Sequence, residues 1–158
     1  MSPKATEGVA AHGTPILGIH MGRLGFLAEV PAAEWEPSLD RIASGQFWLE
    51  ERTMLSCRLR RKDGERGPWD ALNEVVIGRG GISHVVHLAT HVDGGFFTTY
   101  VADGLIVATA TGSTAYALSA GGPILPPELS NMLLVPICPH LSLDRTVVLA
   151  EGATVTIR

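Results

Sequence analysis

The chain has 158 residues, of which 46% are hydrophobic and 18% charged, and this composition is typical of a folded globular protein rather than a disordered one. Its formal net charge is -4 at pH 7, which excludes the excess of Lys and Arg that nucleic-acid binding requires. No stretch approaches the about 18 apolar residues of a membrane-spanning helix, and the N-terminus has no signal-peptide pattern. We therefore predict a cytoplasmic protein with neither a nucleic-acid nor a membrane partner.

The first 50 residues have the pattern of an α/β domain. Residues 15–19 form an apolar run of strand length, and a loop punctuated by glycines follows at 22–27. Pro31 suits the first turn of a helix, and Gly45 marks its end. After Pro31, apolar side chains recur at helical spacing: Trp35, Leu39, Ile42 and Phe47.

From about residue 51 the spacing of apolar residues changes to that of β-strands. The predicted strands lie around residues 55–59, 71–77, 85–92, 96–101, 105–107, 133–137, 146–149 and 154–157, with hairpin turns at 62–64 and 93–95. One short helix is predicted at 113–120, ending at Gly121. The last strand has no partner, so we expect residues 51–158 to form an incomplete β-rich domain.

Residues 102–122, ADGLIVATATGSTAYALSAGG, are the segment richest in chemical groups. Thr111, Ser113 and Thr114 crowd the start of the predicted helix, where Gly112 allows a close approach of the backbone. Free N–H groups at such a helix start suit a phosphate or a ribose hydroxyl. The alternative is that Ser113 simply caps the helix, and physical reasoning alone favours the cap.

Two further polar features stand near predicted strands. Asn73 and Glu74 interrupt the apolar run 71–77, which strand propensity disfavours. Residues that go against local strand propensity often belong to functional sites. The alternative is that this pair lies on an edge strand or in a bulge, with both side chains in water. Asp103 lies in an Asp-Gly turn, and we expect its carboxylate beside the hydroxyl-rich loop, where it would accept hydrogen bonds from a ribose.

Several other kinds of site are disfavoured. Cys57 and Cys138 lack the paired spacing of a zinc site, and we expect both to be buried in apolar surroundings. His87 and His91 fall in a predicted strand with no H-E-x-x-H arrangement, so no metal site is predicted. Neither a Walker A loop nor a G-x-S-x-G elbow occurs.

Four segments, in this order, resemble NAD kinases: PILGIHMGRLGFLAE at 15–29, ALNEVVI at 71–77, the stretch 100–123 with ADGLIV and TGSTAYALSAGGP, and LLVPICPH at 133–140. The resemblance implies an α/β plus all-β fold. Its first part, residues 1–50, would be the remnant of an α/β nucleotide-binding domain. Residues 51–158 would be a partial β-sandwich-like, NAD-binding domain.

The resemblance also implies an activity. NAD kinases transfer a phosphoryl group from ATP, or in some members polyphosphate, to the 2′-hydroxyl of the adenosine ribose of NAD, giving NADP. Mg²⁺ bound with the donor phosphates is implied, as is a homo-oligomer that shares sites between subunits. Asn73 and Glu74 would hold the adenosine end and Asp103 a ribose or the nicotinamide side. The full set of implied NAD-binding residues is Asn73, Glu74, His84, Asp103, Thr111, Thr114, Ala115, Tyr116 and Ser119.

The chain departs from the family pattern in ways that bear on catalysis. The Gly-Gly-Asp-Gly motif, whose Asp acts as the base toward the ribose hydroxyl, does not occur in it, so no catalytic residue is assigned and we expect the isolated chain to have little activity. His20 stands where the family usually has Asn, and Ala110 where it has Pro. The alternatives are a non-catalytic NAD-binding or assembly fragment, and a related lipid or diacylglycerol kinase.

Overall fold

The protein is represented by a computed structural model, which describes residues 12–21, 30–81, 84–140 and 143–158. Contacts within the chain divide it into two units, Met1–Glu51 and Arg52–Arg158. None of the described helices is long and apolar enough to cross a membrane. The glycine-punctuated loop predicted at 22–27 lies outside the described residues.

The first unit contains a short parallel strand pair and one helix. Strand β1 (Ile19–His20) pairs with β2 (Val30–Pro31), so the strand predicted at 15–19 is shorter and begins later than expected. A 3-10 turn, η1 (Ala32–Glu34), leads into helix α2 (Trp35–Ala43). The helix predicted from Pro31 is confirmed, and Gly45 ends it with a φ of 74°, a conformation that glycine adopts without strain.

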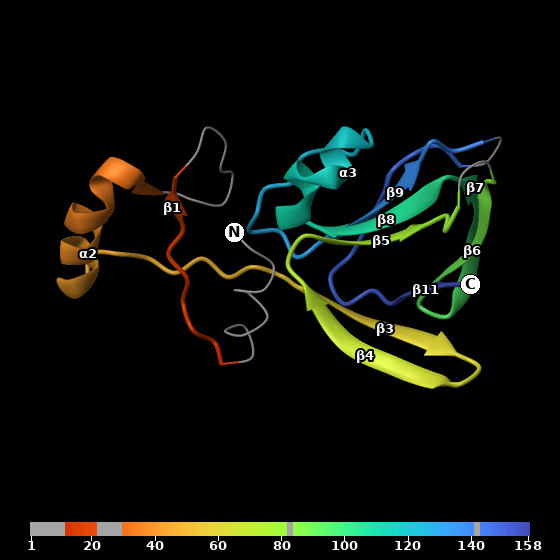
Figure 1. Ribbon diagram of the computed structural model, residues 1–158, viewed down its shortest axis with the longest axis horizontal. Coiled ribbons are helices and arrows are strands. Elements are labelled where there is room, and N and C mark those ends of the chain that lie inside the picture. The colour runs from red at the N-terminus through yellow and green to blue at the C-terminus, as the bar shows by residue number, and fades with distance from the viewer. Residues whose placement is uncertain (1–11, 22–29, 82–83, 141–142) are drawn as a thin grey trace. The chain divides into compact units, whose positions relative to one another are not determined.

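The second unit is built from antiparallel strands (Figure 1). One sheet has the order β10-β9-β8-β5, a second has the order β11-β6-β7, and β3 and β4 form a separate hairpin. The strands are β3 (Leu55–Arg61), β4 (Gly64–Ala71), β5 (Glu74–Gly78), β6 (Val86–Val92), β7 (Gly95–Ala102), β8 (Gly104–Thr109), β9 (Met132–Ile137), β10 (Val147–Leu149) and β11 (Val155–Ile157). Two short helical turns, η2 (Thr111–Thr114) and α3 (Tyr116–Ser119), follow β8.

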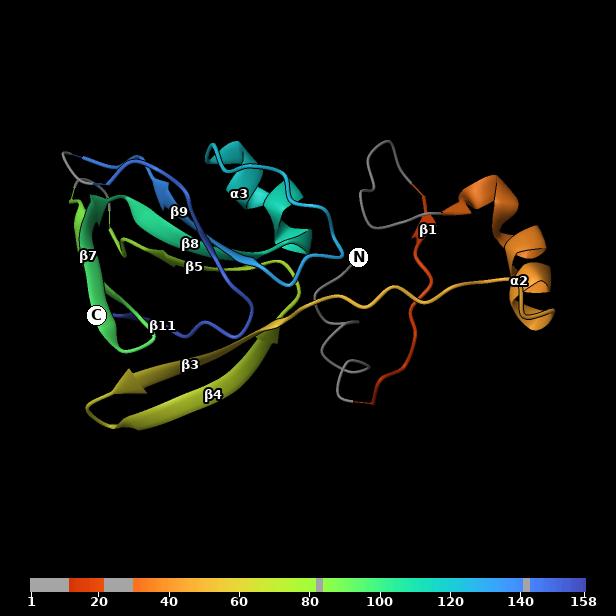
Figure 2. The ribbon, with the colours of Figure 1, turned by 180° about the vertical axis from the view of Figure 1, so that it is seen from behind.

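Strand β8 lies at the centre of the packing, between β5 and β9, and all six of its residues are buried. Because side chains alternate along a strand, Leu105 and Val107 belong to one hydrophobic cluster, with Tyr100 and Leu134. Ile106 and Ala108 belong to another on the opposite face, and the remaining members of that cluster are Ala117, Leu133 and Val135. The second cluster includes Ala117 of α3, the short helix that covers one face of this sheet in Figure 2. The predicted β-sandwich-like domain is confirmed. The expectation that the last strand has no partner is wrong, because β11 pairs with β6 in antiparallel register, over a sequence separation that local patterns do not reveal.

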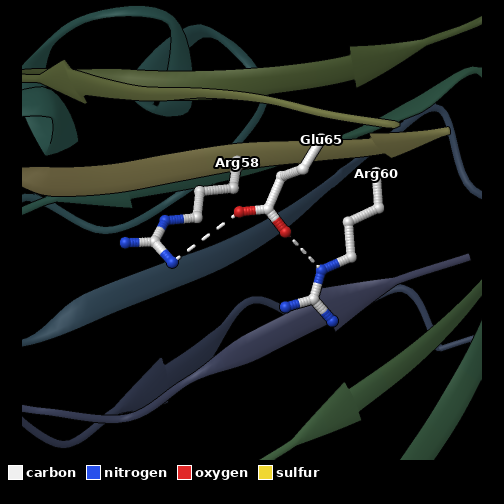
Figure 3. Close-up of polar contacts among 3 residues, drawn as sticks. All are labelled: Arg58, Arg60 and Glu65. Carbon is white, nitrogen blue, oxygen red and sulfur yellow. Dashed lines mark hydrogen bonds and ion pairs between the residues drawn. The ribbon is translucent and has the colours of Figure 1, made fainter. Parts of the chain in front are cut away.

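The β3–β4 hairpin is joined across its strands by an ion-pair network (Figure 3). Arg60 donates from Nε to Glu65 Oε2 at 2.7 Å, and Arg58 Nη1 lies 3.7 Å from Oε1. The hydrogen bond from Arg60 lowers the pKa of Glu65, and the charges of the two arginines act in the same direction. The stabilisation is therefore present at neutral pH and is lost as the pH falls through that lowered pKa, and its exposure to solvent keeps it small.

The two cysteines differ in exposure. Cys57 is half-buried in β3, whereas Cys138 is exposed and has a positive φ of 45°. The expectation that both cysteines are buried is therefore wrong for Cys138 and is met only in part by Cys57. Cys138 directly follows β9, and a segment that leaves the sheet there carries its side chain out of the core.

Replacing Leu134 by Ala tests the central role of this core. Leu134 is fully buried in β9, so Leu134→Ala should lower the free energy of unfolding by about 2–5 kcal/mol. Val148 in β10 is 52% exposed, and Val148→Ala should change it by less than about 0.5 kcal/mol. Urea denaturation followed by circular dichroism measures both, and equal losses in the two variants would contradict the assigned core.

Candidate functional site

The apolar run predicted as one strand, 71–77, is split at the polar pair. Strand β4 ends at Ala71 and β5 begins at Glu74, whose register partner in β8 is Ala108. Leu72 and Asn73 form the connection between the two strands, and the carbonyl oxygen of Asn73 accepts a hydrogen bond from the backbone N–H of Thr109 at 2.9 Å. The pair that broke the strand pattern therefore lies against the last residue of β8.

Glu74 starts an edge strand, but its carboxylate is not left in water. Its Oε2 is buried and has no hydrogen-bond partner among the described residues. Burial raises the pKa of Glu74 above its usual value, because a charged carboxylate loses solvation there. The alternative of a solvated edge-strand pair is thus excluded for this oxygen.

The hydroxyl-rich loop differs from the single helix predicted at 113–120. It forms the 3-10 turn η2, a break at Ala115 and the one-turn helix α3. The backbone N–H groups of Gly112, Ser113 and Ala115 donate to Thr109 Oγ1, the Ala110 carbonyl and the Gly112 carbonyl, respectively. The expectation of free N–H groups for a phosphate is therefore wrong at these three positions.

Ser113 has neither of the roles considered for it. The side chain is fully buried, and no side-chain cap is formed at the start of η2 or α3. Its Oγ instead accepts a hydrogen bond from the backbone N–H of Leu125 at 2.9 Å. Ser113 thus anchors the segment that returns from α3 to the sheet.

The remaining implied residues of this loop differ in accessibility. Tyr116 and Ser119 are exposed on α3, and Thr114 and Ala115 are half-buried. Thr111 is buried, and Arg52 Nη1 donates to its Oγ1 at 3.3 Å. Arg52 was missed by sequence reasoning, because it is 59 residues from Thr111 along the chain and no short-range spacing links them. We call Asn73, Glu74, Thr111, Thr114, Ala115, Tyr116 and Ser119 the loop-end group.

Asp103 lies at the other end of β8 from this group. In the β5–β8 ladder Glu74 pairs with Ala108, whereas Gly78 pairs with Gly104, the residue after Asp103. Six extended residues separate Asp103 from the loop, a distance of roughly 20 Å. The expectation that its carboxylate lies beside the hydroxyl-rich loop is therefore wrong, because β8 runs straight between them (Figure 1).

Asp103 has its own surroundings. Arg79 Nη1 lies 3.3 Å from its Oδ1, and the Arg79 backbone N–H donates to its carbonyl oxygen at 3.2 Å. The exposed His84 precedes β6, whose first residue, Val86, pairs with Ala102, so His84 lies toward the same end. We call Arg79, His84 and Asp103 the turn-end group. Across the described ranges, no three His, Cys, Asp or Glu side chains form a set that could hold a metal ion.

Comparison with known proteins identifies the family of this fold. The family model of the ATP-NAD kinase C-terminal domain matches residues 72–158. The NAD kinase of Geotalea daltonii is 45% identical over 143 residues, which cover 90% of this chain and 50% of that protein. The NAD kinase of Cupriavidus pinatubonensis is 48% identical over 149 residues, covering 94% and 49%. The chain thus spans about half the length of these curated relatives.

Solved structures agree with this result. Yeast NADH kinase, complexed with NADH, superposes with a TM-score of 0.85 at 37% identity, over 91% of this chain and 42% of that one. The NAD kinase from Archaeoglobus fulgidus, in complex with ATP, gives a TM-score of 0.76 at 31% identity, over 90% and 55%. The family match, the curated relatives and the shared fold show that this chain belongs to the NAD kinase family.

Proposed function

We propose that the chain is the dinucleotide-binding part of an enzyme that phosphorylates the 2′-hydroxyl of the adenosine ribose of NAD, with ATP or polyphosphate as the donor. The observation that carries the proposal is the buried Glu74 oxygen without a partner among the described residues, in a protein of this family. A relative with the same fold was solved with NADH and another with ATP, which supports a dinucleotide acceptor and a nucleotide donor.

The loop-end group supplies the chemistry that a ribose and a base require. The Glu74 carboxylate accepts hydrogen bonds from ribose hydroxyls, which offsets part of the cost of burying its charge. The Asn73 carboxamide both donates and accepts, and the exposed ring of Tyr116 offers an aromatic face. Thr114, Ala115 and Ser119 line the dinucleotide pocket, while the buried Thr111 supports the loop from behind.

The turn-end group completes the pocket of a second copy of the chain. Asp103 lies roughly 20 Å from Asn73 and Glu74 along a rigid strand, so one copy does not bring both groups onto the same ribose. A homo-oligomer places Asp103 of one copy beside the loop-end group of another. This arrangement requires a symmetric contact between the two copies.

Phosphoryl transfer depends chiefly on positioning and on neutralising phosphate charge. Mg²⁺ usually binds through substrate phosphates with few protein ligands, so it would enter this site with the donor, and it would neutralise charge on the transferred group. The described residues contribute the other part: they bind the dinucleotide and orient its ribose hydroxyl. No residue described here is assigned as the base.

Titration of NAD into the 158-residue chain tests the proposal directly. We expect saturable heat of binding by isothermal titration, and NADP formation with Mg·ATP assayed on the same sample reports turnover separately. Diacylglycerol in place of NAD is the control for the lipid-kinase alternative. A folded sample that binds no NAD, or that phosphorylates the lipid instead, would overturn the proposal.

Replacing Glu74 by Gln should make the folded protein more stable at neutral pH and weaken its binding of NAD. Burial raises the pKa of Glu74 above its usual value of 4.5. As the pH rises from below 4.5 through the raised pKa, the carboxyl group ionises and the free energy of unfolding falls. The variant should therefore be more stable than the wild type at pH 7 and no more stable near pH 3. Its NAD affinity should fall about 10-fold, and wild-type affinity should fall as the pH is lowered through the raised pKa.

Urea denaturation and NAD titration across this pH range measure both effects. Glu151 is exposed, so Glu151→Gln serves as the matched control, with neither property changed. Wild-type affinity for NAD in the Glu74→Gln variant would show that this carboxylate does not contact the ligand.

Complementation between variants tests the shared pocket. Asn73→Ala and Asp103→Ala should each abolish tight NAD binding, because each damages every pocket. Mixing them under conditions that exchange subunits rebuilds roughly a quarter of the pockets of a randomly paired dimer. The measurement is the number of NAD sites per chain by titration.

The exposed Asp144, which pairs with Arg145, provides the control, since Asp144→Ala should bind NAD like the wild type. A mixture of the Asn73 and Asp103 variants that binds no better than either variant alone would contradict a pocket built from two copies.

A further inference from the structure

Thr109, the last residue of β8, is bonded to both segments of the loop-end group. Its side chain is fully buried. Its Oγ1 donates to the carbonyl oxygen of Leu72 at 2.6 Å, with the Asn73 carbonyl oxygen 3.2 Å away. The same Oγ1 accepts a hydrogen bond from the Gly112 N–H at 3.0 Å. One hydroxyl therefore connects the β4–β5 connection to η2.

Direct backbone packing reinforces this joint. A Cβ on Gly112 would lie 2.0 Å from the carbonyl oxygen and 2.9 Å from the Cα of Asn73, far inside van der Waals contact. Only glycine therefore fits where η2 passes Asn73. The backbone N–H of Thr109 also donates to the Asn73 carbonyl oxygen at 2.9 Å, so Asn73 is held from two sides.

The hydrogen-bonding capacity of a hydroxyl suits this position. Threonine has one proton to donate and lone pairs to accept with, and here the proton serves one segment while a lone pair serves the other. Removing the hydroxyl would leave a buried carbonyl and the Gly112 N–H without this partner, which is costly in a site closed to water. Serine keeps both bonds, whereas valine has nearly the shape of threonine but keeps neither.

We propose that Thr109 is a positioning residue for the dinucleotide: its hydroxyl sets the spacing between Asn73–Glu74 and the loop that carries Tyr116. The inference rests on the proposed function, in which these two segments bind NAD. Thr109 itself is buried and touches no ligand. It acts through the backbone of Asn73 and Gly112, so its loss should weaken binding beyond any effect on stability.

Thr90 provides a matched control for a purely structural role. It is also a fully buried threonine on a strand, and its Oγ1 donates to the Leu88 carbonyl oxygen at 3.1 Å. It lies on β6 in the other sheet, and its hydroxyl bonds within its own strand rather than to the loop-end group. Thr90→Val should lower stability and leave NAD affinity at the wild-type value.

The experiment compares Thr109→Val, Thr109→Ser and Thr90→Val in the 158-residue chain, by NAD titration at a temperature where each is folded. We expect Thr109→Val to weaken NAD binding by about 10-fold or more, the effect of losing buried hydrogen bonds at a binding segment. Thr109→Ser should restore affinity to within about 3-fold of the wild type. Wild-type affinity in Thr109→Val, or an equal loss in Thr90→Val, would overturn the proposal.

Amide hydrogen exchange gives a readout that does not depend on NAD. In Thr109→Val the Gly112 N–H loses its acceptor and should exchange about 10-fold faster than in Thr109→Ser. A wild-type chain that binds no NAD would refute the proposed function. Unchanged exchange of the Gly112 N–H in Thr109→Val would refute the role of the Thr109 hydroxyl in connecting the two segments. Faster exchange with unchanged affinity would refute the positioning role.

A further variant covers the case in which Thr109→Val does not fold. Thr109→Ala also removes the hydroxyl, but it places no methyl group against the carbonyl oxygen of Leu72. It should also weaken NAD binding by about 10-fold or more, and wild-type affinity in this variant would contradict the proposal.

Discussion

The burial of β8 on both faces is the constraint on which the rest of the second unit depends. Its side chains alternate between two hydrophobic clusters, and its backbone is bonded to β5 on one edge and β9 on the other. A strand held in this way does not bend or slide without breaking both ladders. Whatever is attached to its two ends is therefore kept at a fixed separation. Thr109 joins one end of β8 to the loop-end group, and Asp103 of the turn-end group directly precedes the other end.

This separation is the reason for proposing that a second copy completes the pocket. Contacts within one copy hold the two segments of the loop-end group together. Thr109, Gly112 and the Asn73 carbonyl lock two loops together before any ligand arrives, which reduces the ordering cost of binding. The same preorganisation holds Glu74 with a carboxylate oxygen buried and without a partner among the described residues. Such a group lowers stability in the free protein and becomes favourable only with a hydrogen-bond donor beside it. Stability and binding are opposed at this residue.

Much of the fold was predictable from the sequence because local patterns determine it. Short runs rich in apolar and β-branched residues predicted β6, β7 and β9, and the turn at Asp93–Gly95 predicted the hairpin of β6 and β7. The polar pair Asn73–Glu74 was found because it breaks a strand pattern. Contacts over long sequence separations were not predictable: Thr109 bonds to residues 36 and 37 positions away. Asp103 was expected beside the hydroxyl-rich loop because only the six residues of β8 separate the two in sequence. In an extended strand these residues span roughly 20 Å.

A crystal structure of the chain in complex with NAD would show which atoms of which copies surround one dinucleotide. We expect the adenosine ribose to lie against Asn73 and Glu74 of one copy, with Asp103 from a neighbouring copy in the same pocket. The contact of Gly112 with Asn73 should be unchanged from the free protein. A dinucleotide bound wholly within one copy, or one that leaves Glu74 Oε2 without a donor, would contradict the shared pocket proposed for this protein.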